Sequence, residues 1–324
     1  MKPASHDPAG FVDRSRALRS LELSVRRRLE GFLHGDYTGL KSGPGSEPNE
    51  ARPYQPGQDD VRRMDWNVTA RSLEPHVRAP LAERELETWA LVDGSASMDF
   101  GTALSEKRDL AVAIVAAVGL LADRPGNRLG VRVAYGSELV RIPARTGGAA
   151  MRSTLRTLLA LPRIPPAEQP ATDLATAIGR LHRDHPRPGL RVVASDFLEG
   201  AGDEPDAPNW ATPLRRLASR HEVIAVEVVD PRELELPEVG LLTLVDPETG
   251  RRREVQTSRR KVRDLYRAAA RAHRERTKAA FRSAGVAHLL LRTDRDWVRD
   301  VAAFAASRRR SAARRPPGGR TNVR

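Results

Sequence analysis

The sequence predicts an α/β protein with a doubly wound, mostly parallel sheet, and three observations support this fold class. From residue 86 onward, short apolar runs alternate with longer segments that have helical apolar periodicity. The apolar runs are continuous, as expected for strands covered on both faces. The composition, with 40% hydrophobic and 30% charged residues, is typical of a globular protein. Alternation of this kind places helices on both faces of the sheet.

The first 85 residues lack this alternation. Apolar residues spaced among arginines predict a helix over 14–33, and we assign 1–33 to this helix and a disordered start. Residues 34–85 are rich in Gly, Pro, Asp and Asn, and their prolines exclude a long helix. We therefore expect a small irregular or β-rich accessory segment there.

The main domain is expected over 86–306. The apolar runs predict strands at 86–92, 128–135, 139–142, 190–195, 222–229 and 286–291, and a hairpin from 241–245 and 253–256. The periodic segments predict helices at 102–122, 148–161, 173–183 and 212–219, from Ser258 to Gly285, and over 294–306 with Asp294 as N-cap. Residues 307–324, rich in Arg, Pro and Gly, are expected to be a disordered basic tail.

The net charge of +13 is concentrated at the C-terminal end. Residues 251–324 carry 23 Lys and Arg against 6 Asp and Glu, so the remainder is slightly acidic. A general nucleic-acid-binding surface over the whole chain is therefore not expected. The absence of cysteine excludes disulfides and thiolate metal sites. No apolar signal segment opens the chain, and the longest apolar run, 110–122, is shorter than a span of about 20 residues, so a cytoplasmic protein without a transmembrane segment is expected.

Oxygen-bearing side chains follow two of the predicted strands. Asp93, Ser95 and Ser97 come after the first strand of the main domain, and Asp196 comes after the strand at 190–195. Thr172 stands at the start of a predicted helix. Ligand sites in open parallel sheets lie beyond the carboxyl ends of the strands. Because all five side chains offer hard oxygen donors, they favour Mg²⁺, or else Mn²⁺ or Ca²⁺, with a position left for water or a partner's carboxylate.

The D-x-S-x-S pattern, followed by a Thr and a later Asp, resembles the metal-ion-dependent adhesion site of von Willebrand factor A domains. The resemblance implies a doubly wound sheet and a partner that supplies an acidic side chain to the metal. It also implies that Ser95, Ser97 and Thr172 bind the ion directly and that Asp93 and Asp196 act largely through water. Asp173, next in the chain, is expected to cap a helix.

A second resemblance comes from the segment before the main domain. It rests on Arg52-Pro53-Tyr54-Gln55-Pro56-Gly57, Asp59-Asp60, Arg62, Asp65-Trp66 and Ala70-Arg71, followed by Asp93 and Ser97-Met98. These residues are similar to the bacterial family called domain of unknown function 58, over about residues 30–305. The resemblance implies association with a MoxR-type AAA+ ATPase. The residues themselves indicate an Arg–carboxylate network holding the segment against the main domain, or else a partner-docking surface.

The leading functional hypothesis is a non-enzymatic, metal-dependent protein–protein interaction module that serves as adaptor or cofactor of such an ATPase in chaperone-like assembly. The chain has no Walker A, H-E-x-x-H or G-x-S-x-G motif. One alternative is a Mg²⁺-dependent phosphoester hydrolase in which Asp93 and Asp196 position the ion. It would need an activating residue and a phosphate clamp near the metal loop, and the sequence places no lysine or arginine at a matching strand end. A second alternative is nucleic-acid binding through residues 308–324.

Overall fold

The computed structural model describes residues 51–56, 60–72, 74–78, 87–121, 126–136, 138–163, 172–198, 208–246 and 250–313. The predicted helix at 14–33 and the last residues of the predicted tail lie outside these ranges. The chain divides into two compact units, one of Met1–Asp36 with Glu85–Phe304 and one of Tyr37–Arg84 with Ala305–Arg324. Each unit is described by itself.

The smaller unit contains a two-stranded sheet and two short helical segments. Strand β1 (Ala51–Pro53) pairs antiparallel with β2 (His76–Arg78), and η1 (Val61–Arg63) and α2 (Trp66–Ser72) lie between them in the chain. Two acidic residues of the predicted Arg–carboxylate network cap these segments. Asp60 accepts the Arg62 N–H at 3.0 Å, and Asp65 accepts the Asn67 N–H at 3.1 Å. Both acidic side chains therefore satisfy backbone donors at helix starts.

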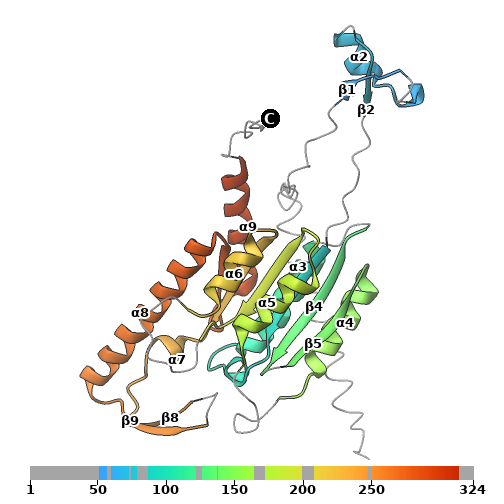
Figure 1. Ribbon diagram of the computed structural model, residues 1–324. Helices are drawn as coiled ribbons and strands as arrows, with labels where there is room; N and C mark the ends of the chain where they lie inside the picture. The colour runs from blue at the N-terminus through green and yellow to red at the C-terminus, as the bar shows by residue number, and fades with distance from the viewer. Residues whose placement is uncertain are drawn as a thin grey trace, which may run out of the picture. The chain divides into compact units, whose positions relative to one another are not determined.

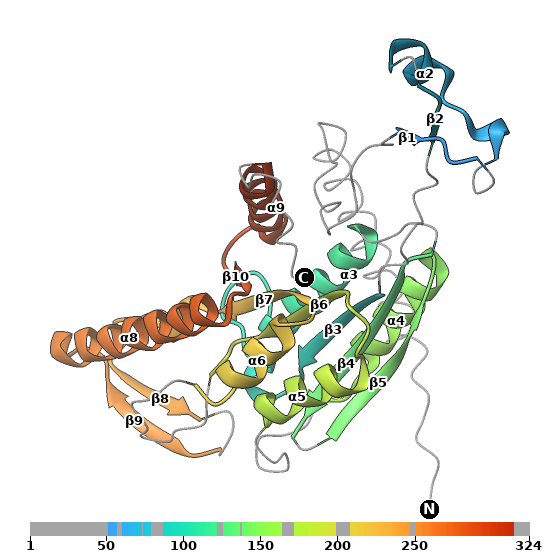
Figure 2. The ribbon, with the colours of Figure 1, turned by 45° about the horizontal axis from the view of Figure 1, so that its top comes forward.

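The larger unit, drawn in Figure 1, is built on a six-stranded sheet. The strand order is β10-β7-β6-β3-β4-β5, and Figure 2 labels these strands. Its strands are β3 (Glu87–Asp93), β4 (Arg128–Tyr135), β5 (Glu138–Arg145), β6 (Leu190–Ser195), β7 (Glu222–Val229) and β10 (Ala287–Arg292). All neighbours pair in parallel except β5, an edge strand that runs antiparallel to β4. The central strand is β3, as the reversal of strand order on its two sides requires. The doubly wound, mostly parallel fold is confirmed.

Helices cover both faces of this sheet, because each central strand alternates apolar side chains between two cores. On β3, Ala90 and Val92 face one core, and Trp89 and Leu91 face the other. The first core is closed by α3 (Lys107–Leu121), α4 (Gly148–Ala160) and α9 (Trp297–Ala313). The second is closed by α5 (Leu174–Asp184), α6 (Ala211–Ala218) and α8 (Arg260–Ala284). The unit is a three-layer α/β/α structure.

The start of α3, the start of α9 and the predicted tail differ from the structure. Helix α3 begins at Lys107 instead of residue 102, because the Thr102 N–H and hydroxyl both bond the Asp230 carboxylate, at 2.8 and 2.6 Å. Helix α9 begins at Trp297, and Asp294 bonds Arg292 at 2.7 Å instead of capping it. The same helix runs to Ala313, so residues 307–313 are not disordered as predicted. Arg and Ala there favour helix, and the first proline comes only at Pro316.

Between β7 and β10 the chain leaves the sheet and returns. It forms the short helix α7 (Pro231–Leu234), which was not predicted, then the hairpin β8 (Leu241–Val245) and β9 (Arg252–Gln256), then α8. Arg259, not Ser258, is the N-cap of α8, and Gly285 ends the helix at a φ of 68°, as predicted. Figure 2 shows the first half of α8 reaching beyond the sheet, with the hairpin beside it.

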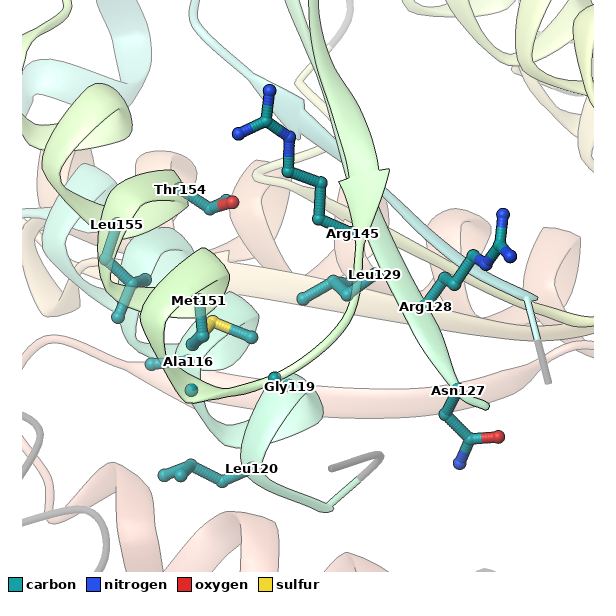
Figure 3. Close-up of a pocket in the computed structure, with 12 residues that line it drawn as sticks. Ala116, Gly119, Leu120, Asn127, Arg128, Leu129, Arg145, Met151, Thr154 and Leu155 are labelled. Carbon is teal, nitrogen blue, oxygen red and sulfur yellow. The ribbon is translucent and has the colours of Figure 1, made fainter. Parts of the chain in front are cut away.

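A small cavity of about 40 Å³ lies between α3, α4 and the start of β4 (Figure 3). Its lining is mainly apolar, from residues such as Leu129, Met151 and Leu155, with Arg128 and Arg145 nearby. It lies at the amino-terminal end of the parallel strands, away from Asp93. Within the described residues, no helix is both long and apolar enough to cross a bilayer.

Candidate metal centre

Asp93 ends the central strand β3 at the carboxyl edge of the sheet. It lies beside Ala134 of β4, and the Gly94 N–H donates to the Ala134 carbonyl at 2.8 Å. A Cβ at Gly94 would lie 2.7 Å from the Tyr135 ring and 2.9 Å from that carbonyl oxygen. Only glycine lets the chain turn this closely past β4. The turn directs the following serines back toward Asp93.

Asp93, Ser95 and Ser97 form one buried cluster. The Ser95 N–H donates to Asp93 Oδ1 at 2.9 Å, and the Ser95 and Ser97 hydroxyl oxygens are 3.0 Å apart. All three residues are at most 6% exposed. The short helix η2 (Ala96–Asp99) fixes Ser97 relative to Ser95, because the Met98 N–H donates to the Ser95 carbonyl. Three of the five predicted ligands therefore meet in one place.

Asp196, directly after β6, lies beside this cluster. The parallel pairing of β3 with β6 brings the carboxyl ends of the two strands together. The Ser195 hydroxyl donates to Asp93 Oδ2 at 2.6 Å, which ties the two strand ends together. Burial raises the pKa of Asp93, and the nearby negative charge of Asp196 raises it further. Phe197 takes a left-handed φ of 54° after Asp196, and the Leu198 N–H then donates back to Asp196 Oδ1 at 3.1 Å. Backbone strain of this kind is common at functional sites.

Thr172 lies at the same edge of the sheet, next to the end of β4. Its hydroxyl accepts the Gly136 N–H at 3.1 Å and is only partly buried. The next residue, Asp173, caps α5 by accepting the Thr176 N–H at 2.9 Å, as predicted. The four other predicted ligands are linked to one another by hydrogen bonds or by charge. The Thr172 hydroxyl instead bonds Gly136, at the end of β4.

Lys107 corrects the expectation that no cation stands near the metal loop. Its side chain is fully buried, and its ammonium donates to Asp196 Oδ2 at 2.7 Å and to Glu233 of α7. Burial alone would lower the pKa of Lys107, but the charges of Asp196 and Glu233 outweigh it and the pKa is raised. The sequence does carry a signal for this lysine. It precedes Leu110, Ala111 and Ile114 at helical spacing, so it falls on the buried face of α3.

Glu233 is held in place by its own helix. The Asp230 N–H donates to Glu233 Oε2 at 2.9 Å in a capping box at the start of α7. Burial raises the pKa of Glu233, as it does for Asp93. Asp230 in turn accepts hydrogen bonds from Thr102 and from the Thr293 hydroxyl, the latter at 2.6 Å. This network connects the carboxyl ends of β6, β7 and β10 with the start of α3.

The charges and donors at this edge fit a hard divalent cation. When ionised, Asp93, Asp196 and Glu233 bring three negative charges, and Lys107 returns one positive charge. A divalent cation would neutralise the remainder. No group of three or more His, Cys, Asp or Glu in the described part of the chain forms a metal cluster, so a site here depends on hydroxyl oxygens. Asp93, Ser95 and Ser97 are the residues placed to hold such an ion, with Asp196 beside them.

Sequence comparison places this site in a family. Residues 50–276 match the family model described as "Protein of unknown function DUF58". The chain belongs to the DUF58 family. The matched range includes most of the smaller unit's described residues and all five predicted ligands. The resemblance inferred from the segment before Asp93 is thereby confirmed.

Similar proteins are found in mycobacteria. Uncharacterized protein Rv1480 of Mycobacterium tuberculosis (strain ATCC 25618 / H37Rv) is 52% identical over 296 residues, which cover 91% of this chain and 90% of that protein. Uncharacterized protein Mb1516 of Mycobacterium bovis gives the same values. Uncharacterized protein MAV169 of Mycobacterium avium is 45% identical over 174 residues, 54% of this chain and 97% of that protein. The DUF58 chain thus aligns with Rv1480 and Mb1516 over nearly their full length.

Solved structures of similar shape include an aerotolerance-related membrane protein from Bacteroides fragilis, at 12% identity and a TM-score of 0.44 over 70% of this chain and 99% of that one. BatB from Bacteroides thetaiotaomicron is 12% identical, with a TM-score of 0.42 over 69% of this chain and 98% of that one. The SpRpn10 VWA domain is 12% identical, with a TM-score of 0.37 over 74% of this chain and 100% of that one. All three TM-scores are below 0.5, so family membership rests on the sequence match.

Proposed function

We propose that this DUF58 protein is a non-enzymatic interaction module that captures a partner's carboxylate through a divalent cation, Mg²⁺ in the first instance. The observation that carries the proposal is the buried cluster of Asp93, Ser95 and Ser97 beside Asp196, which has an excess of negative charge and only oxygen donors. A cation there would keep a coordination position for a ligand from outside the chain. Thr172 would complete the set from the end of β4.

The arrangement of Lys107 supports capture over phosphoester hydrolysis. A hydrolase that uses a lysine or arginine as its phosphate clamp needs that side chain free to contact the phosphate. The Lys107 ammonium is fully buried and is already shared by Asp196 and Glu233. It serves to balance charge within the protein and does not reach a substrate.

The family resemblance supplies the kind of partner. We propose that the protein acts as adaptor or cofactor of a MoxR-type AAA+ ATPase in chaperone-like assembly or maturation. An adaptor that binds through a metal needs no catalytic group of its own. It needs a rigid edge that presents the ion, and the hydrogen bonds from β3, β6 and α3 provide that rigidity.

The test is metal-dependent capture of a MoxR-type ATPase encoded in the same genome, with the full-length chain immobilised in Mg²⁺ or in EDTA. We expect capture in Mg²⁺ only, and its loss in Asp93→Ala and in the double variant Ser95→Ala with Ser97→Ala. The matched control is Asp184→Ala, which removes an aspartate at the opposite edge that bonds Arg132 at 2.8 Å. Equal capture by the wild type and Asp93→Ala, or in EDTA, would refute the metal bridge.

A further inference from the structure

The exposed large apolar side chains of the larger unit all belong to segments that follow the carboxyl ends of its central strands. Among its described residues, seven large apolar side chains are exposed, and we call them the apolar platform. They are Phe100, Leu104, Leu198, Val239, Leu241, Val245 and Leu265. Each belongs to a segment that follows the carboxyl end of β3, β6 or β7, the edge that carries the candidate metal centre. Such clustering of apolar side chains on one part of a surface is typical of an interaction site.

The loop that carries Phe100 and Leu104 is held in a fixed conformation. Thr102 between them bonds Asp230 through both its N–H and its hydroxyl, and the Leu104 N–H donates to the Thr293 carbonyl at 3.0 Å. The Lys107 N–H donates to the Phe100 carbonyl at 2.9 Å. Leu104 nevertheless remains 80% exposed. Because the loop is already ordered, a partner could bury this leucine with little further loss of conformational entropy.

Two members of the platform flank the metal centre directly. The Lys107 ammonium lies 5.9 Å from the centre of the Phe100 ring and 2.7 Å from Asp196. The Leu198 N–H donates to the same aspartate. A partner that placed a carboxylate at the ion would therefore also meet exposed apolar side chains close to it.

The remaining members lie on the part of the chain that extends past the sheet. Helix α8 has 25 residues and a length of about 37 Å, whereas the six residues of β10 span about 20 Å. Its buried side chains all lie in its last third, at Thr277, Ala280, Phe281 and Ala284. The first part therefore projects beyond the edge beside the hairpin, as both ribbon views show (Figures 1 and 2).

Contacts join this projection to the metal centre. The Tyr266 hydroxyl donates to the Arg232 carbonyl of α7 at 3.2 Å, one residue before Glu233. Arg263 pairs with Glu238 at 2.9 Å and donates to the Thr257 carbonyl at 2.6 Å. The hairpin, α7 and the start of α8 are thus tied together at the side of the Lys107 network.

The projection is also strongly basic. Residues 251–271 carry nine Lys and Arg against two Asp and Glu. Arg252, Arg253, Arg259 and Lys261 are exposed there. The positive charge of this surface and a cation at the metal centre attract the same chemistry, a negatively charged partner.

We propose that the apolar platform and the basic start of α8 form a docking surface for an acidic protein segment in which Asp or Glu alternates with large apolar residues. One carboxylate would bind the metal, the apolar side chains would cover Leu104 and Leu241, and other carboxylates would face the arginines. This inference rests on the proposed function for the role of the metal. The exposure of the apolar side chains is observed independently of any ion.

The experiment selects binders from a phage-displayed library of random 16-residue peptides on the immobilised full-length chain in Mg²⁺. The most enriched peptide is then synthesised with a fluorophore and its affinity measured by anisotropy. We expect enriched peptides to combine acidic with large apolar residues. The variant Leu104→Ser with Leu241→Ser should weaken binding at least about tenfold. Val61→Ser, which removes a 54% exposed valine in the other unit, is the matched control and should have no effect.

The outcomes separate this inference from the proposed function. Binding that survives EDTA and Asp93→Ala but is lost in the serine variant supports the docking surface and refutes the metal bridge. Loss of binding on chelation, with no effect of the serine variant, supports the metal bridge and refutes the docking surface. Enrichment of peptides without acidic or without apolar residues overturns the inference. So does binding to phosphatidylserine vesicles, weakened by the serine substitutions, in place of any peptide.

Discussion

Lys107 shows how one residue can hold a buried site together. Its ammonium contacts the carboxylates of Asp196 and Glu233, which come from different strand ends, and all three side chains are largely buried. Burying two carboxylates is costly unless a cation and hydrogen bonds compensate. The Lys107 ammonium therefore neutralises charge between the two carboxylates, as a bound metal ion does in many proteins, and it is a fixed part of the chain.

Replacing this lysine should be strongly destabilising. We expect Lys107→Met to lower the free energy of unfolding by about 3–5 kcal/mol, because the two carboxylates would stay buried without their partner. Urea unfolding at neutral pH measures this. The control is Lys278→Met, whose partner Glu275 is exposed and lies 2.7 Å away, and which should cost no more than about 1 kcal/mol. Similar costs for both variants would contradict the compensating role of Lys107.

Two buried histidines at the opposite edge make stability depend on pH. His185 is the C-cap of α5 and stacks on Trp89 with the ring centres 3.6 Å apart. Burial, with Arg132 next in effect, lowers the pKa of His185 to about 4. Burial, with Arg191 next, lowers the pKa of His221 to about 4. Both side chains are therefore neutral in the folded protein at pH 6.

Because histidines in the unfolded chain titrate near pH 6.5, the unfolded state binds more protons between about pH 6.5 and 4. We expect the free energy of unfolding to fall as the pH is lowered through this range, and to fall less steeply in His221→Gln. Chemical denaturation at a series of pH values measures both slopes. A wild-type slope equal to that of the variant would show that His221 does not contribute.

At the scale of elements, glycines mark where strands and helices approach closely. Gly189 precedes β6, and a Cβ there would lie 2.1 Å from the Glu87 carbonyl oxygen of β3. Gly179 lies within α5, and its nearest neighbour would be an Arg183 side-chain nitrogen at 3.5 Å. The two glycines therefore have different reasons to be present.

We expect opposite effects when these glycines are replaced. Gly189→Ala should destabilise the fold by about 2 kcal/mol or more, because backbone at the centre of the sheet must move. Gly179→Ala should stabilise it by up to about 1 kcal/mol through higher helix propensity. Thermal or urea unfolding of both variants decides this. Destabilisation by Gly179→Ala would show that this face of α5 has no room for a methyl group.

The errors in helix ends share a cause at this scale. Residues 102–106 fit a helical apolar pattern, but Thr102 bonds Asp230, a residue 128 positions away. Asp294 is a suitable N-cap by type, yet Arg292 takes its carboxylate. In the first case a residue far along the chain binds the polar groups near the predicted helix start, and in the second a neighbour two positions away binds the carboxylate that would have capped the helix.

At the scale of the whole molecule, the candidate metal centre is expected to reduce stability when no ion is bound. Asp93 is buried next to Asp196, and this repulsion is relieved by a cation or by removing a charge. The Ser195 hydroxyl bonds Asp93 and so links the ends of β3 and β6. The repulsion between the two aspartates therefore acts on both of these central strands.

We therefore expect Asp93→Asn in EDTA to be at least as stable as the wild type. In MgCl₂ only the wild type should gain stability, by about 2.7 kcal/mol at a concentration 100 times the dissociation constant. Differential scanning calorimetry in EDTA and in a MgCl₂ series measures this, with Asp184→Asn as a control that keeps the response. Equal stabilisation of the wild type and Asp93→Asn by Mg²⁺ would place the ion elsewhere.

The sequence by itself determined the fold class, the six strands of the main sheet and the DUF58 resemblance. Continuous apolar runs and turn residues are local signals, and they remain valid wherever the sheet places each strand. It also predicted that Asp93, Ser95, Ser97 and Asp196 share one edge of the sheet, since the carboxyl ends of neighbouring parallel strands lie together.

Only the tertiary structure decided which side chains compensate the buried charges at this edge of the sheet. Lys107 and Glu233 lie 126 residues apart in the chain, and no local pattern pairs them. The same is true of the apolar platform, whose members come from four separate segments. Partners of a buried charge and neighbours on a surface are set by the packing of distant elements, and packing is a property of the folded chain as a whole.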